Sequence, residues 1–161
     1  MEQRPPQLDP NASVTLSAIR DAVDLTYTVG SQGKWVVLPF LATFFFVNLS
    51  TSMFTIVVWW ANSFAIAFFG IMYHDFSRIE EGAFQTRKVI DLALNPPQDH
   101  GDQATFMTLQ LNNVRNAIEQ IDRMNENVKV LSYISWPMRN VKGNLEQIRD
   151  HIDQQLTPKP I

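Results

Sequence analysis

The chain consists of one long apolar run between two charged segments that show helical periodicity. Residues 35–73 contain no Asp, Glu, Lys or Arg, so all 29 charged side chains lie in the first 34 and the last 88 residues. Roughly 18 apolar residues are enough for a helix to span a bilayer. At ~1.5 Å per residue, one helix over this run would measure about 58 Å, nearly twice the hydrocarbon thickness of about 30 Å. The pattern therefore predicts an all-α integral membrane protein with a transmembrane hairpin at residues 34–73.

The position of the turn in this hairpin is open between two segments. Asn and Ser readily hydrogen-bond to their own backbone, which favours a turn at 48–52, with Asn48, Ser50 and Ser52 as the membrane turn. The other candidate is 59–63, where two tryptophans would form an interfacial belt. That break leaves a single span over 36–58, followed by a segment at the membrane surface.

The flanking segments are predicted to be helical. Residues 1–33 form an N-terminal tail and an amphipathic helix, which we expect to lie in the headgroup layer or to dock on a neighbouring subunit. The apolar stripe of this helix contains Leu16, Ile19, Val23 and Tyr27. Gly30 and Gly33 are expected to break it ahead of the membrane. After the apolar run, residues 74–95 form a juxtamembrane helix, and the prolines at 96 and 97 open a linker over 96–103.

The C-terminal segment, residues 104–161, carries a heptad pattern typical of a coiled coil. Pro137 interrupts it, which predicts either an antiparallel helical hairpin or one kinked helix. Asn125, a polar residue in the apolar row, either sets the register or marks a fraying helix end. Two helices of this length bury little surface, so we expect their seam to bind a partner, either another subunit or the juxtamembrane helix. The alternative is that the two apolar stripes simply face each other. The predicted interaction residues are Met107, Leu111, Val114, Ile118, Ile121, Val128, Val141, Leu145, Ile148 and Ile152.

Composition and motifs offer no catalytic chemistry. The net charge is −3 without a basic block, which argues against nucleic acid as a partner, and there is no cysteine. The three histidines are far apart in sequence and lack the spacing of a metal site. The pairing to consider is His74 with Asp75, at the end of the apolar run. Glu80 and Glu81 lack a matching base or ligand, and no phosphate-binding, dinucleotide-binding or hydrolase motif occurs. We therefore expect a non-enzyme without metal or cofactor.

Two functional hypotheses follow. The first is an accessory or structural subunit of a larger membrane complex, of a secretion-type or energy-transducing kind, which binds other subunits or copies of itself. The second is a self-assembling pore lined by polar residues of the apolar run. The expected location is a bacterial inner membrane, or alternatively the mitochondrial inner membrane. The flanking basic residues favour both termini on the cytoplasmic or matrix side.

Overall fold

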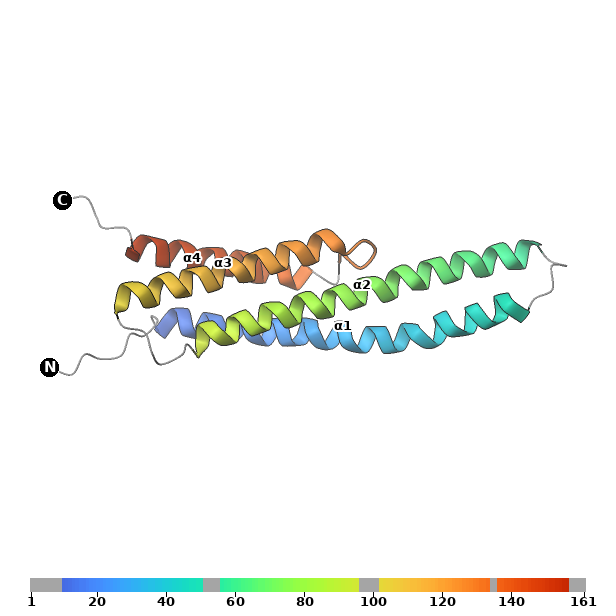
Figure 1. Cartoon of the computed structure of the whole chain (residues 1–161), viewed down its shortest axis with the longest axis horizontal. Coiled ribbons are helices and arrows are strands. Elements are labelled where there is room, and N and C mark those ends of the chain that lie inside the picture. The colour runs from blue at the N-terminus through green and yellow to red at the C-terminus, as the bar shows by residue number, and fades with distance from the viewer. Residues whose placement is uncertain (1–9, 51–55, 96–101, 134–135, 157–161) are drawn as a thin grey trace.

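The computed structural model describes residues 10–50, 56–95, 102–133 and 136–156, and four helices account for nearly all of them. Helix α1 spans Pro10–Ser50, α2 spans Ile56–Leu94, α3 spans Gln103–Asn127 and α4 spans Trp136–Leu156. Successive helices run in opposite directions (Figure 1). Consecutive helices pack together, and α4 also packs against α1, which closes the ring. This arrangement is an up-down-up-down four-helix bundle.

Two of the helices are much longer than the other two. By residue count, α1 and α2 measure about 60 Å, whereas α3 and α4 measure ~31–37 Å. The excess lies at one end, where α1 and α2 continue as a pair beyond the bundle (Figure 1). We call residues 35–50 and 56–73 the apolar hairpin, and we call residues 10–34 and 74–94 together with α3 and α4 the bundle.

The bundle has a continuous hydrophobic core to which all four helices contribute. The stripe predicted for the N-terminal helix is part of it, because Leu16, Ile19 and Val23 are at most 2% exposed. The amphipathic N-terminal part of α1 therefore completes the bundle with α2, α3 and α4. Helix α2 contributes Ile79, Ala83 and Ile90, among others.

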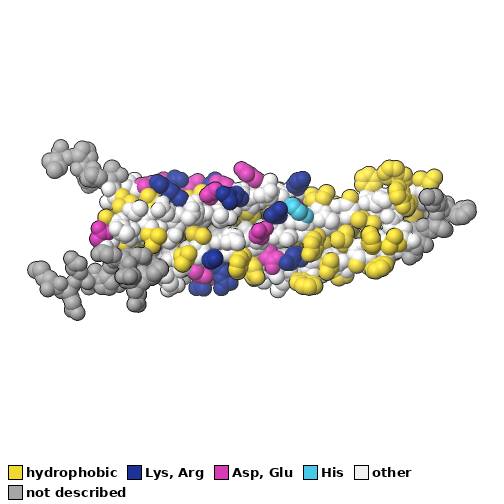
Figure 2. Space-filling model, viewed as in Figure 1, with side chains coloured by type: hydrophobic (Ala, Val, Ile, Leu, Met, Phe, Trp, Pro, Cys, Tyr) yellow, Lys and Arg dark blue, Asp and Glu magenta, His cyan; other side chains and the backbone are white. Residues whose placement is uncertain are grey.

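The apolar hairpin has the opposite distribution of side chains. Of the 23 large hydrophobic residues that are exposed in the described part of the chain, 17 lie in the hairpin. Figure 2 shows charged side chains over the bundle and hydrophobic side chains over the far end. Both α1 and α2 are long and apolar enough to cross a membrane, and only 6% of each apolar window is buried.

The chain reverses direction near the first of the two predicted turns. Helix α1 ends at Ser50 and α2 begins at Ile56, so Asn48 and Ser50 lie in the last turn of α1. Ser52 lies outside the described residues. The alternative segment, 59–63, is helical and contains no break.

The structure differs from the predicted break at residues 29–33, because α1 is continuous through both glycines. A Cβ added to Gly30 would lie 2.7 Å from the backbone nitrogen of Glu80, and one added to Gly33 would overlap the ring of Phe76. These glycines therefore allow α2 to approach α1 closely. A glycine costs a helix only about 1 kcal/mol, which tertiary packing readily offsets.

The C-terminal segment forms the predicted antiparallel pair, since α3 and α4 are separate helices. Asp102 caps the start of α3, where its carboxylate accepts a hydrogen bond from the Thr105 backbone N–H at 2.8 Å. Pro137 is the second residue of α4, a position at which its missing N–H costs no helical hydrogen bond. Asn125 lies in the last turn of α3.

Candidate functional site

The junction between the bundle and the apolar hairpin holds a group of specific polar contacts. Lys34, the last charged residue before the apolar run, forms an ion pair with Glu80 across the two long helices. Further from the hairpin, Asp24 pairs with Arg87 at 3.1 Å and Arg20 with Asp91 at 2.8 Å. These pairs mark a single antiparallel register along α1 and α2, and the register brings Gly33 against Phe76 at the junction.

Asp75 is the central residue of the junction. It lies two residues after the apolar run, and its side chain is fully buried. Its Oδ2 atom accepts hydrogen bonds from three consecutive backbone N–H groups in the loop that follows α3. The donors are Lys129 at 3.1 Å, Val130 at 2.6 Å and Leu131 at 3.0 Å. Consecutive amides that converge on one oxygen form an anion-binding arrangement, so this carboxylate holds the α3–α4 loop against α2.

The environment of Asp75 favours its charged form. Burial raises the pKa of Asp75, but the N–H groups of Leu131, Val130 and Lys129 and the neighbouring His74 together lower the pKa below its ordinary value. His74 Nδ1 lies 3.7 Å from the second carboxylate oxygen, Oδ1, and forms an ion pair with it when protonated. The sequence places His74 next to Asp75, but it does not reveal the contact with the loop, because the loop amides are 54 to 56 residues away in sequence.

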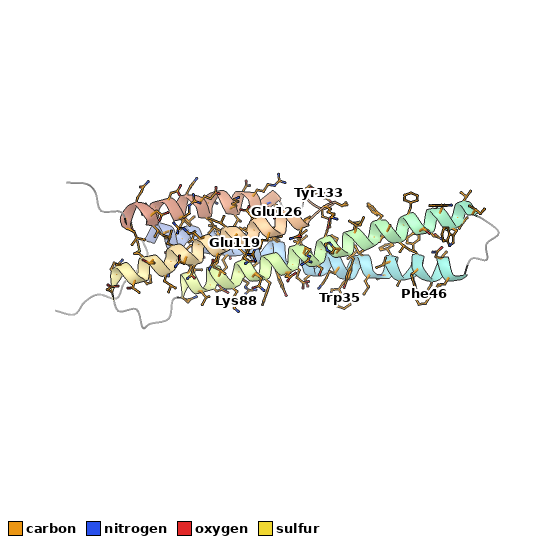
Figure 3. The ribbon with its side chains drawn as sticks, turned by 45° about the horizontal axis from the view of Figure 1, so that its top comes forward. Trp35, Phe46, Lys88, Glu119, Glu126 and Tyr133 are labelled. Atoms are coloured by element: carbon orange, nitrogen blue, oxygen red, sulfur yellow. The ribbon has the colours of Figure 1, made fainter. Side chains whose placement is uncertain are left out.

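Aromatic side chains surround the junction at a similar level along the molecule. Trp35, the first residue of the apolar hairpin, is 68% exposed, and Tyr133 in the α3–α4 loop is 70% exposed. Figure 3 shows both near the level at which the bundle ends, on opposite sides of that view. Tyr73, the last residue of the apolar run, is also exposed.

The polar residues of the apolar hairpin lie near its tip. Asn62 on α2 is buried at 8% exposure, and Asn48 on α1 is partly buried. The register of the ion pairs places Asn48 and Asn62 at the same level. The Nδ2 of Asn62 and the Oδ1 of Asn48 are both buried and form no hydrogen bond among the described residues.

The predicted interaction residues all lie in the bundle core. Each is at most 8% exposed, and α2 packs against α3 while α1 packs against α4. The chain's own helices thus cover the seam, and α2 contains the juxtamembrane segment, which was one of the two expected partners. The buried set is Met107, Leu111, Val114, Ile118, Ile121, Val128, Val141, Leu145, Ile148 and Ile152.

Within the described ranges, no three His, Asp or Glu side chains are grouped so that they could hold a metal ion. His74 lies on α2 and His151 on α4, and His100 falls outside those ranges. A surface groove of about 220 Å³ between α2 and α3 is lined by Arg78, Glu81 and Arg123, among others. In the groove, Arg78 pairs with Glu81 and Arg123 pairs with Glu119, so the cations are already neutralised.

The fold and the junction define an all-helical chain in which a four-helix bundle continues into a two-helix apolar hairpin. Comparison of the chain with protein-family models, with curated proteins and with solved structures finds no match in any of the three.

Proposed function

We propose that the chain is a non-enzymatic integral membrane subunit that serves an accessory or structural role in a larger membrane complex. The apolar hairpin anchors it in the bilayer, and the bundle stands on one face of the membrane. The outer surface of the bundle and the sides of the hairpin are then the surfaces available to neighbouring subunits or to other copies of the chain.

The match between the exposed apolar surface and the thickness of a bilayer is the observation that carries this proposal. The hairpin extends 16 residues beyond the bundle on α1 and 18 on α2, or about 24 and 27 Å, against a hydrocarbon core of about 30 Å. Soluble monomers rarely expose contiguous apolar patches above a few hundred Å², and this hairpin is apolar on nearly all sides.

The geometry also supports a common side for both ends of the chain. Helix α1 begins and α4 ends at the end of the bundle that is far from the hairpin (Figure 1). In a membrane, both would lie on the side that holds the bundle. The basic residues nearest to the apolar run, Lys34 and Arg78, favour the cytoplasmic or matrix side under the positive-inside rule.

Two exposed phenylalanines provide a matched test of insertion. Phe46 in the hairpin is 66% exposed and Phe84 in the bundle is 51% exposed, so a charge is tolerated at both positions if both face water. In lipid, an arginine near the centre of a span costs about 2.5–3.5 kcal/mol on insertion scales. We expect Phe46→Arg, but not Phe84→Arg, to reduce the fraction that resists extraction by alkaline carbonate. Equal retention of both variants would contradict insertion.

The subunit role is tested by native mass spectrometry after gentle solubilisation from the native membrane. We expect the chain to be recovered with other proteins or in a defined oligomer. A monodisperse single chain without a co-purifying protein would contradict this part of the proposal.

The pore hypothesis receives less support from the geometry. It needs the polar residues of the hairpin to face a shared lumen, whereas Asn62 is only 8% exposed. The anchored subunit is therefore the preferred proposal.

A further inference from the structure

The α3–α4 loop lies where the surface of the membrane would be. This placement rests on the proposed insertion of the hairpin. The hydrogen bonds from Lys129, Val130 and Leu131 fix the loop to Asp75, which is two residues beyond the end of the apolar run. In Figure 1 the loop is the part of the α3–α4 pair nearest to the hairpin.

Besides the polar Lys129 and Ser132, this loop exposes two large apolar or aromatic side chains. Leu131 turns inward and is 1% exposed, whereas Val130 and Tyr133 turn outward and are 40% and 70% exposed. Loops in water are mostly polar, and an exposed tyrosine with an aliphatic neighbour is typical of the membrane interface. A tyrosine ring prefers this layer because its body is apolar while its hydroxyl remains hydrated.

We propose that the α3–α4 loop is a second membrane contact, in which Val130 and Tyr133 insert into the headgroup layer of the leaflet next to the bundle. Its partner is the lipid surface itself. Asp75 acts as the tether, because its carboxylate holds the loop backbone and so fixes how far the two side chains reach. With Trp35 on the other side, the bundle is supported at the interface from both α1 and the loop.

The absence of cysteine allows single-cysteine labelling at chosen depths. Each variant carries an environment-sensitive fluorophore in vesicles of mixed phosphatidylcholine and phosphatidylglycerol. Quenchers are placed at the lipid headgroup, deep in the acyl chain, or in the water as iodide. The reporters are Phe46→Cys for the hairpin, Trp35→Cys for the interface, Lys129→Cys for the loop and Glu119→Cys for the water-exposed bundle; Figure 3 shows Phe46, Trp35 and Glu119.

We expect the headgroup quencher to quench the Lys129 reporter as it quenches the Trp35 reporter. We also expect iodide to quench the Lys129 reporter several-fold less than the Glu119 reporter. Quenching by iodide equal to that at Glu119 overturns the loop contact, even when Phe46 is quenched deep in the bilayer. Protection from both iodide and lipid quenchers also overturns it, because a protein then covers the loop. A Phe46 reporter without any lipid quenching overturns the proposed function instead.

A further test keeps the fluorophore at position 129 and changes the two side chains that are proposed to insert. It shows whether these side chains, and not the fluorophore itself, hold the loop in the headgroup layer. We expect Val130→Ser with Tyr133→Ser to raise iodide quenching at the Lys129 reporter several-fold. Leu92→Ser, an exposed leucine near the other end of the bundle, is the matched control and leaves the quenching unchanged. Equal quenching in the double variant and the parent would show that these two side chains do not hold the loop in the interface, and would overturn the proposal.

Discussion

A single carboxylate at the junction, that of Asp75, holds the backbone of the α3–α4 loop in place. Asp75 forms three charge-assisted hydrogen bonds to Lys129, Val130 and Leu131, and it is buried, so these bonds compete little with water. A hydrogen bond to a charged group contributes about 1.5–3 kcal/mol, roughly twice the value for a neutral pair. At the residue scale, the order of the junction therefore depends on the charge of Asp75.

We predict that Asp75→Asn destabilises the bundle by about 2–3 kcal/mol at neutral pH. The amide oxygen that accepts from the three N–H groups is neutral, and the NH₂ group takes the buried place of Oδ1, which has no hydrogen-bond partner among the described residues. The folded pKa of Asp75 is lowered, so its contribution is fully present above the unfolded pKa of about 3.9 and is lost as pH falls through the folded pKa. The difference between wild type and variant should therefore shrink below about pH 4, as measured by urea denaturation in mild detergent.

Asp21→Asn is the control for this prediction. Asp21 is an exposed carboxylate on α1, and its replacement should change the free energy of unfolding by no more than about 0.5 kcal/mol. An Asp75→Asn variant as stable as the control at pH 7 would show that the three hydrogen bonds do not order the loop.

At the scale of elements, local sequence patterns predicted where the helices lie, but they did not predict which helices pack against each other. The stripe at Leu16, Ile19 and Val23 correctly indicated an amphipathic helix, but its period cannot distinguish a lipid surface from the chain's own α3 and α4. The two glycines illustrate the same limit. Glycine weakens a helix locally, yet Gly30 and Gly33 lie where α2 approaches most closely, information that only the tertiary structure contains.

The glycines of the bundle should therefore respond in opposite ways to the same substitution. At Gly30, a methyl group would meet the backbone of Glu80 at 2.7 Å and 3.0 Å, and such overpacking costs about 1–3 kcal/mol. At Gly143 on α4, no atom lies within 4 Å of the added carbon, so alanine should stabilise the helix by up to about 1 kcal/mol. Thermal denaturation followed by circular dichroism compares Gly30→Ala with Gly143→Ala, and a stabilised Gly30→Ala would contradict the close approach.

At the scale of the whole molecule, α1 and α2 each have two parts with different surroundings, one inside the bundle and one in the apolar hairpin. Within the bundle they present apolar stripes to α3 and α4, and beyond Lys34 and Asp75 they present apolar side chains outward. The change in pattern at the junction could be read from the sequence, because charges stop at 34 and resume after 73. The closed bundle could not, since the same heptad seam fits a partner chain or the chain's own long helices equally well.

This ambiguity leads to a prediction for the isolated C-terminal segment, residues 102–161. Without α1 and α2, the core faces of α3 and α4 lose their cover, and a dimer of two such hairpins could rebuild a four-helix core. We expect helicity by circular dichroism and mass by sedimentation to rise together with concentration. Ile121→Asp, at a position that is 0% exposed in the bundle, should abolish this association, whereas Asn116→Asp on the exposed side of α3 should not. A fragment that is fully helical and monomeric at all concentrations would show that α3 and α4 do not need the long helices to cover their seam.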